Sequence, residues 1–100
     1  MSSFDLQHQI AELNTKIEAA EALLKPMVEA QKSDEMRLEA LHTRIHNATN
    51  EPEKVQLQQE ASALEKQMDE RLEKVTPVAQ EEHGYRFQRK ALQADLQALA

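Results

Sequence analysis

Apolar residues recur through the first half of the chain at alternating spacings of three and four positions. The series consists of Leu6, Ile10, Leu13, Ile17, Ala20, Leu24, Met27, Leu38, Leu41, Ile45 and Ala48. It keeps one heptad frame throughout, and Gln31 and Asp34 occupy two of the seam positions in its middle. A sustained heptad pattern of this kind predicts a helix that packs along a coiled-coil seam.

The second half of the chain carries a similar series. Its members are Leu57, Ala61, Leu64, Met68, Val75, Val78, Tyr85, Leu92, Leu96 and Leu99. Three polar residues, Arg71, Glu82 and Arg89, occupy seam positions within it. Leu72 and Ala79 lie one position off the frame, which indicates that the apolar surface drifts or widens there.

A helix end and a helix start lie close together between the two series. Asn50 is a good N-cap, Pro52 is tolerated in a first helical turn, and Glu53 follows the cap by three residues. We therefore predict one domain of residues 1–100, with helices at about 3–49 and 52–99 and a turn at about 49–52. Ser2 and Asp5 are a plausible cap for the first helix.

Folding the chain back at this turn matches the two series. Residues equally far from the turn then face each other, and apolar residues meet apolar residues in nearly every layer. Gln31 faces Arg71, and Asp34 lies close enough to Arg71 for a salt bridge. The sequence thus predicts an all-α fold, a long antiparallel two-helix coiled-coil hairpin that dimerises into a four-helix assembly.

Pro26 and Pro77 fall at almost the same level of this hairpin. An interior proline removes one backbone hydrogen bond, so we expect kinks near both residues. The alternative is a compact four-helix bundle in which the prolines break the helices and Thr76 caps a new one. The unbroken register through Leu24 and Met27 favours the hairpin.

Composition supports a helical chain and disfavours nucleic-acid-binding and membrane proteins as function classes. The sequence has one Gly, no Cys and a net charge of −6. This charge disfavours nucleic acid and anionic membranes as partners, and no apolar run is long enough for membrane insertion. With no signal peptide in view, we expect a cytoplasmic protein whose partners are proteins.

Apolar residues outside the seam are the candidate partner sites. One set, the central band, consists of Leu23, Val28, Ala30, Leu72 and Ala79. We interpret the central band as a self-association surface of a homodimer, the alternative being ordinary drift of the seam at kinked helices.

A second candidate surface lies beside Gly84, which suggests a local distortion or the close approach of another backbone. This client segment consists of Tyr85, Arg86, Phe87, Arg89 and Lys90. Tyr85 falls in the seam, whereas Phe87 points outward next to basic residues, a combination typical of binding hot spots.

Catalytic and metal chemistry have little support. His42 and His46 have the spacing of a metal clamp but no third ligand beside them. Catalytic motifs and phosphate-binding loops are lacking, so we expect no enzyme and no cofactor. The leading hypothesis is a small interaction module acting as adaptor, chaperone or assembly factor. Alternatives are an inhibitor that docks a helical face on an enzyme or nucleoprotein complex, and a structural filament or secretion-apparatus subunit.

Overall fold

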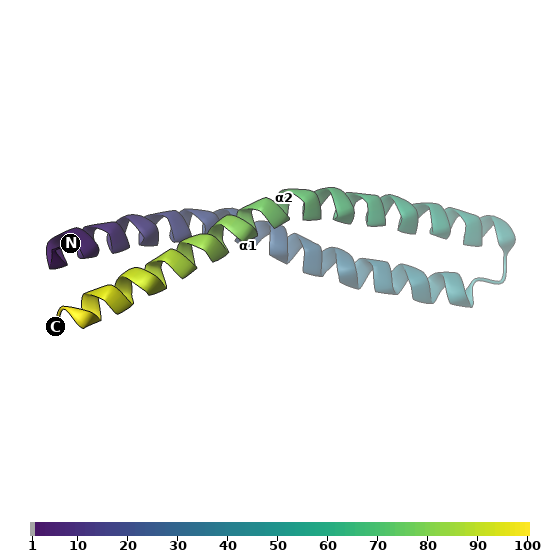
Figure 1. Ribbon diagram of the computed structural model, residues 1–100. Coiled ribbons are helices and arrows are strands. Elements are labelled where there is room, and N and C mark those ends of the chain that lie inside the picture. The colour runs from purple at the N-terminus through teal and green to yellow at the C-terminus, as the bar shows by residue number, and fades with distance from the viewer. Residues whose placement is uncertain (1) are drawn as a thin grey trace. The chain divides into compact units, whose positions relative to one another are not determined.

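The structure, a computed structural model, describes residues 2–100 and contains two helices (Figure 1). Helix α1 spans Ser3–Asn47 and α2 spans Glu51–Ala98, and no strand occurs in this range. The predicted all-α, two-helix hairpin is confirmed. The four-helix alternative is wrong, because Pro26 and Pro77 both lie inside continuous helices.

Local hydrogen bonds begin each helix where the sequence predicts. The Asp5 backbone N–H donates to Ser2 Oγ at 3.2 Å, and that hydroxyl donates to the Asp5 carboxylate at 2.9 Å. At α2, the Glu53 N–H donates to Asn50 Oδ1 at 3.2 Å. These caps satisfy N–H groups that the first turn of a helix leaves without partners, and so fix where the hairpin turns.

The chain divides into two compact units, each a pair of antiparallel helix segments. The terminal unit joins the start of α1, up to Lys25, to the segment Thr76–Ala100. The loop unit is Pro26–Val75 and contains the turn. Each proline lies at a boundary between the units, where its helix lacks one backbone hydrogen bond.

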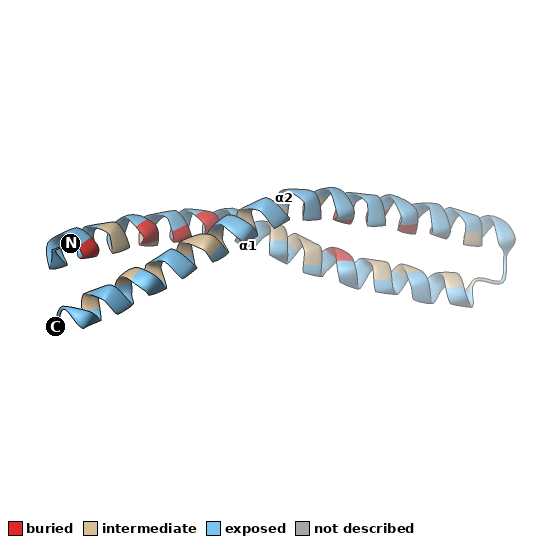
Figure 2. Cartoon of the chain, in the orientation of Figure 1, coloured by how far each residue is buried: buried red, intermediate tan, exposed pale blue. Residues whose placement is uncertain are grey.

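The buried apolar residues all belong to the predicted seam (Figure 2). In the terminal unit they are Leu6, Leu13, Ile17 and Ala20, and in the loop unit they are Leu57, Ala61, Leu64 and Met68. The seam residues facing them, such as Leu41 and Leu92, are half-buried. A core of this kind is one side chain deep, so much apolar surface lies close to solvent in each unit.

One polar layer interrupts the seam of the loop unit. Asp34 is 7% exposed, and its carboxylate accepts from the Arg71 guanidinium at 2.8 Å. Arg71 also donates to Gln31 Oε1 at 2.9 Å, as the fold-back predicts. A more exposed arginine, Arg37, reaches Asp34 at 3.3 Å. The buried carboxylate is thus neutralised from both helices, and the layer fixes their register.

Candidate protein-binding surfaces

The loop unit has a shallow groove in which both helices contribute exposed apolar side chains. We call it the apolar groove; its volume is about 290 Å³. Its lining residues are Met27, Val28, Gln31, Lys32, Glu35, Leu72 and Val75. Val28 is 41% exposed and Leu72 is 51% exposed. The structure therefore brings together two residues of the central band, one from each helix.

The remaining central-band residues lie elsewhere. Ala30 is half-buried on the opposite flank of α1, because it precedes Gln31 in the heptad whereas Val28 follows Met27. Leu23 and Ala79 belong to the terminal unit, where both are exposed. The structure thus groups Val28 with Leu72 and adds Met27 and Val75, which the sequence analysis assigned only to the seam.

Two charged residues line the apolar groove beside Gln31. Lys32 and Glu35 both lie on α1 and are exposed. Neither has an ion-pair partner among residues 2–100. The groove therefore carries one positive and one negative charge, both available to a molecule that docks there.

Heptad-equivalent positions elsewhere on this flank are occupied by polar side chains that contact each other across the helices. Two heptads from Val28 along α1, His42 Nε2 lies 3.6 Å from the carboxylate of Glu65. In the terminal unit, Arg86 pairs with Glu21, which is one heptad from Val28. Polar contacts at such positions bridge the two helices across the edge of the seam. At the apolar groove, Val28 occupies the heptad position of Glu21 and Leu72 that of Glu65, whereas Glu35 keeps a charge on this flank.

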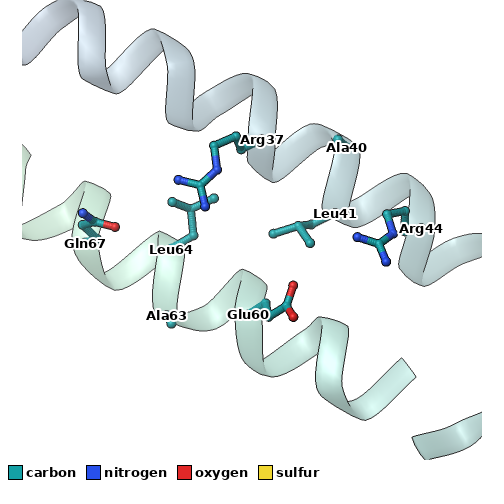
Figure 3. Close-up of a pocket in the computed structure, with 8 residues that line it drawn as sticks. All are labelled: Arg37, Ala40, Leu41, Arg44, Glu60, Ala63, Leu64 and Gln67. Carbon is teal, nitrogen blue, oxygen red and sulfur yellow. The ribbon is translucent and has the colours of Figure 1, made fainter. Parts of the chain in front are cut away.

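A second groove of the loop unit lies on the other flank of the seam and holds about 500 Å³ (Figure 3). Its lining residues are Arg37, Ala40, Leu41, Arg44, Glu60, Ala63, Leu64 and Gln67. Arg37 already contacts Asp34. The alanine side chains are small and offer a docking molecule little apolar contact area. The sequence pattern does not point to this surface, because its alanines and arginines are typical of an ordinary solvated helix face.

Three residues of the client segment make contacts within the terminal unit. The Lys16 ammonium lies 5.6 Å from the centre of the Tyr85 ring, within cation–π range. Arg89 donates to Asn14 Oδ1 at 2.8 Å. Arg86 donates to Glu82 at 2.8 Å and pairs with Glu21. These contacts hold the segment against α1.

The charges around Arg86 have a further effect. Its hydrogen bond to Glu82, aided by the negative charges of Glu82 and Glu21, raises the pKa of the guanidinium. Arg86 is therefore a fixed positive charge that is already bound to two carboxylates. A client would have to compete with both of them.

The other two residues of the client segment, Phe87 and Lys90, are exposed on α2, and Phe87 is 70% exposed. Lys90 also lines a groove of about 480 Å³ along α2 with Gln93, Ala94, Leu96 and Gln97. No other part of the described chain approaches Gly84, since a Cβ added there would meet nothing within 4 Å.

Several exposed apolar side chains lie outside both predicted surfaces. They are Phe4, Met36, Val55 and Leu99. The heptad series skipped the first three, and it placed Leu99 in the seam, where the end of α2 leaves it exposed. The sequence could have identified them only as apolar residues at outward heptad positions. Such residues are common on protein surfaces and do not by themselves indicate a binding site.

Other site types are not found in the described part of the chain. No group of three metal-ligating side chains occurs within residues 2–100, and neither helix in that range has the length of apolar sequence that crossing a membrane requires. Comparisons with protein-family models, curated proteins and solved structures find no match. The surfaces themselves therefore carry the functional argument.

Proposed function

We propose that this chain is a small coiled-coil protein–protein interaction module that self-associates and acts as an adaptor, chaperone or assembly factor. The observation that supports this function best is the pair of exposed side chains, Val28 and Leu72, next to a seam that is otherwise complete. Large apolar side chains gathered from two helices at one groove are typical of surfaces that bind protein.

The seam needs no additional polar contacts. No buried side-chain nitrogen or oxygen in residues 2–100 lacks a hydrogen-bond partner. The side chains that the two helices leave exposed include the large apolar ones of Val28 and Leu72, and removing apolar area from water supplies the main driving force of association. Binding of protein at the apolar groove thus stabilises the chain without rearranging its seam.

The client segment is the second element of the proposal. Phe87 is the anchor, because an exposed aromatic ring offers a large contact area with few rotatable bonds. Lys90 adds a charge beside it. Tyr85, Arg86 and Arg89 position the segment through their contacts with Lys16, Glu21 and Asn14.

Site-specific photocrosslinking tests the client contact. A photoreactive phenylalanine derivative replaces Phe87 in one variant and Phe4 in a matched control, since both rings are exposed in the terminal unit. We expect a discrete cross-linked product with a different protein from position 87 and none of that size from position 4. Identical products from both positions, or none from position 87, would contradict the client role.

A further inference from the structure

We infer that the apolar groove binds the same groove of a second copy in a two-fold arrangement, in which Lys32 of each copy pairs with Glu35 of the other. This inference rests on the self-association in the proposed function and specifies its surface, its symmetry and its pairing rule. Residues that contact each other reciprocally are the hallmark of a two-fold interface.

The charges of the groove favour an identical partner. A basic partner would repel Lys32 and an acidic partner would repel Glu35, whereas a rotated copy presents the opposite charge to each residue. Neither residue is used in an ion pair within the part of the chain that is described. The groove is therefore complementary to itself in charge as well as in its apolar character.

The position of Leu72 fits this symmetry. Its neighbour Arg71 contacts both Gln31 and Asp34, at 2.9 and 2.8 Å. Leu72 follows Arg71 on the antiparallel helix, so it lies level with Lys32, slightly nearer the start of α1, and both residues line one groove with Glu35. A two-fold axis midway between Lys32 and Glu35 places a lysine–glutamate pair on each side, with the two Leu72 side chains close to the centre.

The chain exposes more surface than a compact protein of its mass. The chain exposes 7469 Å². A compact monomer of 11.4 kDa exposes about 5,800 Å² on the usual scaling of area with mass. The excess is more than the approximately 800 Å² that each partner of a standard interface buries. The whole chain therefore has enough exposed surface for an interface of standard size, and the apolar groove supplies an apolar part of it.

Charge-swapped variants test the pairing rule. Lys32→Glu gives a copy with two acids at the groove, and Glu35→Lys gives a copy with two bases. Each variant alone places like charges together twice, so we expect its dimer dissociation constant to rise by about tenfold or more. An equimolar mixture restores both pairs, and we expect a mixed dimer about as tight as the wild-type dimer.

Native mass spectrometry with one variant labelled with ¹⁵N identifies the mixed dimer, and sedimentation equilibrium gives the dissociation constants. Leu72→Glu should also prevent dimerisation. Val55→Glu is the matched control, because Val55 is 47% exposed on the same helix but outside the groove. Circular dichroism verifies that every variant retains the helical content of the wild type.

The outcomes separate this inference from the proposal on which it rests. Dimers that survive both charge variants, or a mixture that fails to restore dimerisation, overturn the inference and leave self-association through another surface. A wild-type chain that stays monomeric overturns both the inference and the self-association. Loss of the dimer in Val55→Glu as well would show that the groove is not its specific site.

Discussion

Replacing Arg71 with leucine tests whether the polar layer holds the two helices of the loop unit together. The change removes the 2.8 Å contact to Asp34 and the 2.9 Å hydrogen bond to Gln31. Asp34 then keeps only Arg37, at 3.3 Å from a side chain that is itself mostly exposed. The variant leaves a buried carboxylate with one weak partner.

The expected loss of stability depends on how deeply the Asp34–Arg71 ion pair is buried. Hydrogen bonds to charged groups contribute about 1.5–3 kcal/mol, and breaking a fully buried ion pair costs about 3–5 kcal/mol. The Arg71 side chain is 17% exposed, and Arg37 still neutralises part of the Asp34 charge. We therefore expect Arg71→Leu to lower the free energy of unfolding by about 2 kcal/mol.

Urea denaturation followed by helical circular dichroism measures this loss. All variants are compared at one protein concentration, because association adds to the apparent stability. The double variant Asp34→Leu/Arg71→Leu removes both charges and should recover at least about 2 kcal/mol relative to Arg71→Leu. Equal stability of Arg71→Leu and the wild type would refute the reasoning, because it would mean that the buried carboxylate needs no partner.

Substitutions at three further positions test local features. Gly84→Ala should raise the free energy of unfolding by about 0.5–1 kcal/mol, because the added Cβ meets nothing; a loss of stability in denaturation would show that the helix needs glycine there. Asn50→Ala should cost about 1 kcal/mol and Asn50→Gly only a few tenths, and equal losses would contradict the capping role. Phe87→Ala should change stability by less than about 0.5 kcal/mol, whereas a larger thermal shift would place Phe87 in the core.

The fold followed from the sequence because two independent patterns agreed. The heptad series predicted which residues are buried, and the turn signals at Asn50 predicted how the series face each other. Together they also predicted the contacts of Arg71 with Gln31 and Asp34, which are confirmed. A two-helix seam is set by regular periodicity, so a register deduced at the turn extends along both helices.

The candidate sites could be predicted from the sequence less completely than the fold. The exposure and grouping of residues beside the seam depend on local geometry that the heptad pattern does not specify. Val28 and Leu72 were singled out together, but the role of Lys32 and Glu35 in the same groove was not. On a sequence they read as ordinary solvated charges, and only the groove shows that they flank exposed apolar side chains. The cost of glycine in a helix suggested a local distortion or a close approach at Gly84, and the structure has open space beside it within this chain.

Light scattering coupled to size exclusion, over two orders of magnitude of protein concentration, tests most directly whether the exposed apolar groove is a self-association surface. We predict a constant mass of twice 11.4 kDa, because burying Val28 and Leu72 against a second copy removes apolar area from water. A constant mass of 11.4 kDa at every concentration would contradict self-association.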